Sequence, residues 1–192
     1  MAAMMRALLT GLALIVPAAA PGEQFRPTIQ RESVPWVDPR PAPRGERLLI
    51  SAMLDGHNSA RASYGVAALS WDPALARSAM VYARRLAASG RFEHDPANRG
   101  PAPQGENLFM GTRAAYSYAE MVGGWVNERR HYRPGPVPTN SRTGDFSAVG
   151  HYTQIIWPTT QRVGCATASS RSHDYLVCRY WPAGNVVGTR LR

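Results

Sequence analysis

The sequence predicts an α+β domain in which helices come first and an antiparallel sheet follows. Apolar residues recur at helical spacing between residues 46 and 132. Short runs of apolar, β-branched and aromatic residues follow between residues 150 and 181. Glycine, proline and aspartate mark the boundaries between these segments. Helices in one half of a domain and strands in the other half are typical of helices layered on a sheet.

Three helices are expected in the first half of this domain. The first begins near Glu46 and stops at Gly65. The second has Asp72 as its N-cap, with a proline in its first turn, and ends at Gly90. The third covers about residues 116–132.

Three shorter features can also be predicted. Residues 106–108 are expected to form a short turn of helix. Gly123 and Gly124 lie inside the third helix, where each costs about 1 kcal/mol of helix propensity, so we expect close packing there. Residues 182–185 are expected to form a turn whose glycine is suited to a positive φ.

Three strands are expected at residues 150–157, 163–168 and 174–181. The last two contain the only cysteines of the chain, Cys165 and Cys178. An even cysteine count in an exported chain favours a disulfide, which would stabilise the hairpin by about 3 kcal/mol on the chain-entropy model. Two buried thiols are the alternative.

The first 22 residues have the pattern of an export signal. Arg6 precedes a short apolar run, and small residues follow up to Ala20. The apolar run is shorter than the roughly 20 residues that span a bilayer. We therefore expect cleavage between Ala20 and Gly22, and a secreted or periplasmic protein without a transmembrane anchor after processing. A retained anchor is the alternative.

The rest of the chain divides into a linker and one domain. Residues 23–45 are rich in proline and have little apolar periodicity, which predicts an extended linker. Residues 46–192 carry the periodic segments and are enough for one core. The predicted organisation is a signal peptide over residues 1–22, the linker, and this domain.

Composition indicates a globular, strongly basic chain. Hydrophobic residues make up 44% and charged residues 18%, with a formal net charge of +9. Such a charge favours loose contact with acidic partners, such as envelope polymers or anionic lipid headgroups. The arginines are scattered and form no basic stripe with aromatic residues, so specific nucleic-acid binding is not expected.

Two histidines and two glutamates are candidate site residues. His94 follows the second helix, and His151 begins the expected strand at 150–157, where loops converge at a strand end. Glu128 lies three residues beyond an apolar tryptophan on the same helical face, and Glu106 follows a glycine. Carboxylates near apolar surface need a partner, which an imidazole or a metal ion can supply. Local patterns alone do not bring the four residues together.

Four segments, in order, resemble the motifs of the CAP superfamily. They read His-Asn-Ser-Ala-Arg at 57–61, Gly-Glu-Asn-Leu at 105–108, Gly-His-Tyr-Thr-Gln-Ile-Ile-Trp at 150–157 and Tyr-Leu-Val-Cys-Arg-Tyr-Trp-Pro-Ala-Gly-Asn-Val at 175–186. The family comprises cysteine-rich secretory proteins, antigen 5 and pathogenesis-related class 1 proteins, with many bacterial members. The resemblance covers about residues 46–188.

The resemblance implies a three-layer α-β-α sandwich with a small, mainly antiparallel sheet between helices. It also implies a cleft that holds His94, Glu106, Glu128 and His151. In related proteins the histidines can bind a divalent cation such as zinc, so His94 and His151 are the expected metal ligands. Two imidazoles leave coordination positions open, which predicts a weak and accessible site.

The chemistry of this cleft has several interpretations. The first is a non-catalytic protein that binds a lipid or other apolar ligand, or an envelope component. The second is a metal-dependent hydrolase of protease or esterase type that uses the same four residues. The third is a purely structural network of the same residues. The chain has no nucleophile elbow, zincin motif or phosphate loop, and Ser147 is an ordinary loop serine, so we assign no catalytic residue.

Overall fold

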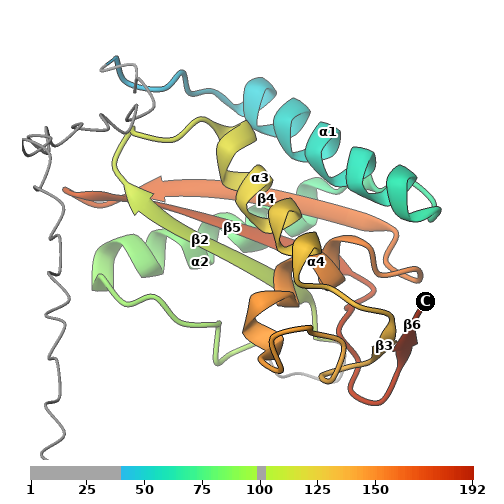
Figure 1. Cartoon of the computed structure of the whole chain (residues 1–192). Coiled ribbons are helices and arrows are strands. Elements are labelled where there is room, and N and C mark those ends of the chain that lie inside the picture. Colours follow the sequence, from blue (N-terminus) through green and yellow to red (C-terminus); the bar gives the residue numbers. More distant parts are fainter. Residues whose placement is uncertain (1–39, 99–102) are drawn as a thin grey trace, which may run out of the picture. The chain divides into compact units, whose positions relative to one another are not determined.

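The computed structural model describes residues 40–98 and 103–192; the predicted signal peptide and most of the predicted linker lie outside these residues. The elements, in chain order, are α1 (Glu46–Tyr64), β1 (Ser70–Trp71), α2 (Pro73–Ser89), β2 (Gly105–Thr112), α3 (Tyr118–Asn127), the 3-10 helix η1 (Glu128–Arg130), β3 (Gly135–Pro136), the 3-10 helix η2 (Phe146–Ala148), α4 (Gly150–Ile155), β4 (Arg162–Ser169), β5 (His173–Trp181) and β6 (Arg190–Leu191) (Figure 1).

The main sheet has four strands in the order β1, β4, β5, β2. β5 is the centre of this sheet, because it pairs antiparallel with β4 on one side and with β2 on the other. β1 runs parallel to β4 and pairs with it through only two residues. The sheet is therefore small and mainly antiparallel, as predicted. β3 and β6 form a separate two-stranded sheet.

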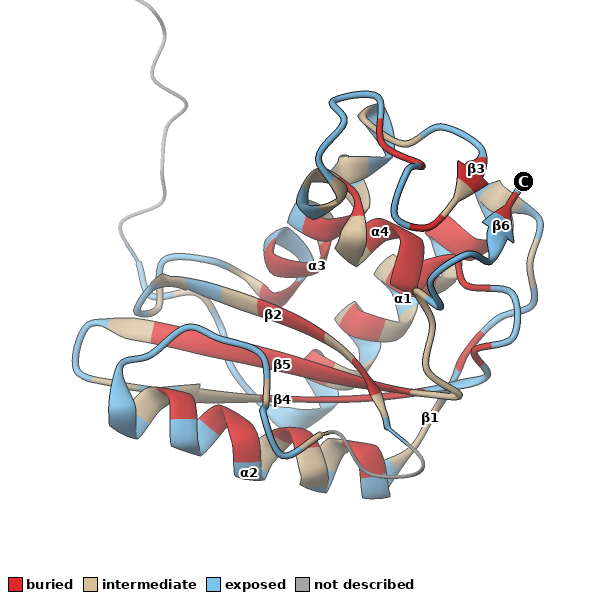
Figure 2. Cartoon of the chain, turned by 90° about the horizontal axis from the view of Figure 1, so that it is seen from below, coloured by how far each residue is buried: buried red, intermediate tan, exposed pale blue. Residues whose placement is uncertain are grey.

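Helices cover both faces of the main sheet, which gives the three layers (Figure 2). α2 covers one face, and α1, α3 and α4 lie over the other. Each large apolar side chain buried between the layers contributes about 2 kcal/mol. The core under α2 contains Ala79, Tyr82, Ala83, Leu86, Leu108, Ala166, Tyr175 and Val177. The larger core on the other face includes Met53, Met121, Trp125, Ile155, Trp157, Leu176 and Tyr180.

The predicted ends of the first two helices are confirmed. α1 starts at Glu46, and Gly65 follows it in the left-handed conformation with φ of 84°. The Asp72 side chain accepts hydrogen bonds from two backbone N–H groups at the start of α2, and Gly90 ends this helix with φ of 70°. The third helix is shorter than predicted: α3 begins after the capping box of Ser117 and continues as η1 from residue 128.

The strand predicted at residues 150–157 is wrong, because residues 150–155 form α4. Its side chains are buried continuously from Tyr152 to Trp157 instead of on alternate sides. Distant side chains satisfy both ends of this short helix. The Glu128 carboxylate accepts the N–H groups of His151 and Tyr152, and the Arg61 guanidinium donates to the carbonyl oxygens of Ile155 and Trp157.

Three smaller predictions are also corrected. Residues 106–108 belong to β2, not to a helical turn, because all eight β2 residues pair with β5. A Cβ atom at Gly123 or Gly124 would meet no atom within 4 Å, so neither glycine marks close packing. In the turn at 182–185 the positive φ of 55° belongs to Asn185 and not to the glycine.

The predicted disulfide is confirmed. Cys165 and Cys178 are directly opposite each other in the β4–β5 register and are joined by a bond. Within the described part of the chain, no helix is both long enough and apolar enough to cross a membrane.

Candidate functional site

His151 and Glu128 form one of two histidine–glutamate pairs. Nδ1 of His151 lies 2.5 Å from Oε1 of Glu128. The other carboxylate oxygen accepts the backbone N–H of His151 at 3.0 Å and that of Tyr152 at 3.1 Å. The imidazole also stacks on Trp125 with 5.7 Å between ring centres. One carboxylate thus orients the ring and starts the helix that carries it.

His94 and Glu106 form the other pair. His94 lies in the loop after α2, and its Nδ1 is 2.6 Å from Oε1 of Glu106 on β2. The same oxygen accepts the backbone N–H of Asp95 at 3.1 Å. Glu106 therefore fixes both the ring and the backbone of this loop.

A buried arginine lies behind the His94–Glu106 pair. Nη2 of Arg179 lies 3.1 Å from Oε2 of Glu106 and 2.7 Å from Oδ2 of Asp95. Its side chain is only 2% exposed. Its guanidinium also lies over the Tyr82 ring at 5.3 Å. Burial, followed by the charges of Glu106, Asp95 and Glu93, raises the pKa of Tyr82 to about 12.

A buried hydrogen-bond chain ties the two pairs to the core. The side-chain amide of Asn107, next to Glu106, donates to the carbonyl oxygen of His151 at 3.1 Å and to the Tyr180 hydroxyl at 3.0 Å. The Tyr180 hydroxyl is 2.7 Å from Nε2 of His57. Burial raises the pKa of Tyr180 well above its ordinary value. The sequence singled out the motif containing Asn107 but gave this amide no role.

His57 has a structural role. It is fully buried in α1, and its Nδ1 lies 2.6 Å from the Met53 carbonyl oxygen. Burial is the main cause that lowers the pKa of His57 from 6.5 to about 4. The neutral ring therefore donates from Nδ1 and accepts the Tyr180 hydroxyl at Nε2.

The structure pairs the four candidate residues two by two. Among residues 40–98 and 103–192, no three His, Cys, Asp or Glu side chains form a group that could hold a metal ion. In both pairs the glutamate takes the Nδ1 side of the ring. A neutral imidazole that donates from Nδ1 keeps the lone pair of Nε2 for another ligand.

Ser147 shows no sign of activation. Its hydroxyl donates to Oδ2 of Asp145 at 2.6 Å, and its backbone N–H donates to the other oxygen of the same carboxylate. These contacts cap η2. No imidazole in the described residues hydrogen-bonds to this serine.

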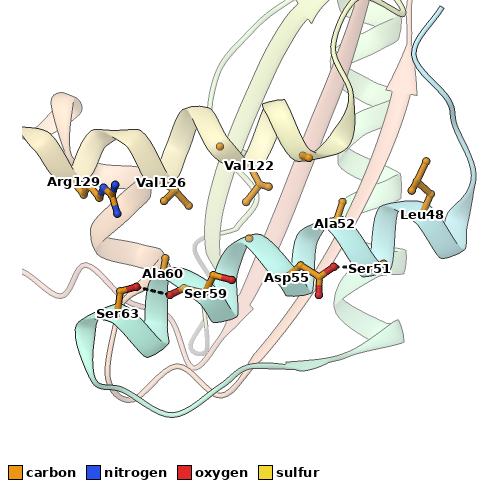
Figure 3. Close-up of a pocket in the computed structure, with 13 residues that line it drawn as sticks. Leu48, Ser51, Ala52, Asp55, Ser59, Ala60, Ser63, Val122, Val126 and Arg129 are labelled. Atoms are coloured by element: carbon orange, nitrogen blue, oxygen red, sulfur yellow. Dashed lines mark hydrogen bonds between the residues drawn. The ribbon is translucent and has the colours of Figure 1, made fainter.

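A separate groove of about 420 Å³ lies between α1 and α3 (Figure 3). Ala52 and Ala60 of α1 face Val122 and Val126 of α3 across it. A Cβ atom at Gly56 would lie 2.6 Å from a Val122 methyl group, so this glycine permits the close approach of the two helices. Sequence reasoning missed the groove, because no local pattern shows which helix lies opposite α1.

The fold agrees with the comparison to known families. Residues 54–180 match the model of the CAP family, described as the cysteine-rich secretory protein family. The chain belongs to this family. It is 38% identical over 136 residues to pathogenesis-related protein 1C of Nicotiana tabacum, a match that covers 70% of this chain and 76% of the relative.

Two further comparisons bear on function. Over 140 residues, the chain is 34% identical to secreted protein RBT4 of Candida albicans, covering 71% of this chain and 36% of that protein. The crystal structure of NaASP2 with Zn2+ is similar in fold, with a TM-score of 0.64 and 25% identity. That similarity covers 78% of this chain and 88% of NaASP2.

Proposed function

We propose that this chain is an exported, non-catalytic binding protein that holds a divalent cation at His94 and His151 and an acyl chain in the groove between α1 and α3. Export is supported by the predicted signal peptide, by the family description and by the similarity to a secreted fungal protein. Cation binding rests on one observation: each imidazole is oriented by a glutamate through Nδ1.

The chemistry of these contacts suits zinc. A metal-bound histidine usually donates its second ring N–H to a carboxylate, which fixes the ring and makes the ligating nitrogen more basic. Glu106 and Glu128 are in place for that role, and Nε2 of each ring would then be the ligand atom. Bound zinc would supply an open Lewis-acid position. The similar fold of NaASP2 was determined with Zn2+, which supports the choice of zinc.

A calorimetric zinc titration of residues 23–192 tests the cation site. The wild type should bind zinc saturably, and binding should be lost in His94→Ala and in His151→Ala. His131→Ala is the matched control, because this histidine lies outside both pairs and its Nε2 accepts a hydrogen bond from Nε of Arg130. Equal binding by all four proteins would contradict the proposed ligands.

The groove suits an acyl chain with an acidic headgroup. Alanines, glycines, valines and Leu48 give the groove apolar surface, and Ser51, Asp55, Ser59 and Ser63 of α1 add polar groups to its lining. Arg129 of η1, which directly follows α3, is exposed and lines the groove, where it can meet a carboxylate or phosphate (Figure 3).

Two neighbouring glycines give a matched test of the groove. Gly123 lines it and Gly124 does not, and a Cβ atom at either position meets nothing within 4 Å. Gly123→Leu should fill the groove and abolish displacement of a fluorescent fatty acid, whereas Gly124→Leu should retain it. Both changes raise helix propensity, so folding should be preserved. Equal fatty-acid binding by both variants would contradict the location.

The hydrolase interpretation is decided by turnover. Zinc-loaded protein should not cleave peptide or ester panels. Turnover that disappears in His94→Ala and His151→Ala would replace the binding function with catalysis.

A further inference from the structure

One edge of β4 is paired over only part of its length. On one side, β5 pairs with every residue of β4. On the other side, β1 pairs only with Arg162 and Val163, because Pro73 begins α2 immediately afterwards. The edge of residues 164–169 therefore has no neighbouring strand within the described residues.

The free backbone groups on this edge can be assigned. The N–H of Asp72 donates to the carbonyl oxygen of Val163 at 2.8 Å, so Val163 faces the β1 side. Alternate residues of a strand direct both N–H and C=O to the same side, so Cys165 and Thr167 also face this edge. No backbone or side-chain group within residues 40–98 and 103–192 bonds these outward groups.

A pocket of about 540 Å³ lies against the same part of the edge. Residues 165–167 line it, together with Leu49 and Ile50 of α1 and Ala76 and Met80 of α2. It shares no lining residue with the groove between α1 and α3. The pocket thus combines apolar helix walls with unpaired backbone donors and acceptors.

This combination selects the chemistry of the occupant. Nearly all buried backbone N–H and C=O groups are paired in folded proteins, and an acyl chain cannot pair them. An extended peptide can, because its own backbone continues the ladder. Its side chains would alternate between the α1 wall and the α2 wall, so both faces of its centre should be apolar. Glu46 and Arg77 also line the pocket and can meet charges on its flanks.

We propose that this pocket docks an extended polypeptide segment with apolar central residues. The segment pairs with the outward backbone groups of Cys165 and Thr167, along the part of the β4 edge that β1 leaves unpaired. The site is independent of the cation and acyl-chain sites.

The probe is the synthetic peptide acetyl-Lys-Thr-Val-Ile-Val-Thr-Glu-amide, titrated into residues 23–192. Amide hydrogen exchange is read by NMR for each β4 residue. The peptide should slow exchange at Cys165 and Thr167. Exchange at Gly164 and Ala166 should change little, because their amides face β5. A peptide N-methylated at its central isoleucine lacks one backbone donor, so its affinity should be at least about tenfold lower.

Thr167→Pro removes one outward N–H and is compatible with an edge strand. It should weaken peptide binding by about tenfold or more, whereas Thr167→Val, which keeps the backbone donor, should bind as the wild type does. Met80→Arg provides a second test on the α2 wall, independent of the strand backbone, and should also lose binding.

Several outcomes would overturn the proposal. These are no binding of the peptide to the wild type, equal binding to Thr167→Pro and Thr167→Val, or binding without protection of Cys165 and Thr167. A concentration-dependent dimer that Thr167→Pro abolishes would also contradict it, because a second copy would then be the occupant of the edge.

Discussion

The two histidine–glutamate pairs make the same contact in opposite surroundings. In the first pair the His94 side chain is 70% exposed, whereas Glu106 is 5% exposed. In the second pair the exposures are closer, at 31% for His151 and 18% for Glu128. In the first pair only the Glu106 carboxylate is buried. In the second pair Glu128 bonds to the start of α4 and His151 stacks on Trp125, so both partners are held in place.

This difference separates two ways of preparing a ligand. His151 is preorganised by the start of α4 and by the Trp125 ring. His94 is attached to an exposed loop but is held by a buried ion pair beneath it. We therefore expect His151 to be the rigid ligand and His94 the adjustable one when a cation binds.

The largest expected effect concerns His57, which serves as the buried reference for both exposed rings. The unfolded ring takes up a proton near pH 6.5, whereas the folded ring does so only near its lowered pKa of about 4. Its contribution to stability is therefore present above pH 6.5 and is lost as the pH falls towards 4, by about 3 kcal/mol. Urea unfolding at both pH values should show a smaller loss for His57→Gln. An equal loss in the variant would contradict this account.

The next effect tests the buried side of the first pair. Glu106→Gln leaves the Arg179 guanidinium with Asp95 as its remaining carboxylate partner. We expect a cost of about 3 kcal/mol in the free energy of unfolding, because removing one member of a buried ion pair leaves uncompensated charge. Urea denaturation measures it.

The corresponding change in the second pair should cost less. Glu128→Gln keeps one oxygen acceptor for the N–H groups at the start of α4, so we expect about 1 to 2 kcal/mol. A cost for Glu128→Gln as large as that for Glu106→Gln would remove the proposed difference between the pairs.

The smallest effect is a difference in chemical accessibility. Diethyl pyrocarbonate should modify His94 faster than His151 and should not modify the fully buried His57. Peptide mass mapping over time gives the three rates. Modification of His151 before His94 would contradict the order of exposure.

The helix ends were predictable from the sequence because their signals are local. Asp72 before Pro73, and glycines after the last apolar turn, fix α1 and α2 through contacts within a few residues. α4 was not predictable in this way. The sequence of residues 150–157 is rich in β-branched residues, yet Glu128 and Arg61 satisfy its ends from far along the chain.

The site was predictable only in part for the same reason. Local patterns indicated the four residues, the family resemblance placed them in one cleft, and the structure showed their pairing through Nδ1. The buried amide of Asn107, which links the two pairs to Tyr180, depends on the β2–β5 register. No spacing rule within one segment indicates such a contact.

Nitrogen-15 NMR of the histidine rings during a zinc titration tests the central claim most directly. Before zinc is added, His94, His151 and His57 should each carry a proton on Nδ1, the ring nitrogen that faces the hydrogen-bond acceptor. Zinc should shift the Nε2 signals of His94 and His151 and leave that of His57 unchanged. Shifts at Nδ1, or shifts confined to His131 and His173, would contradict a cation held by two glutamate-oriented imidazoles.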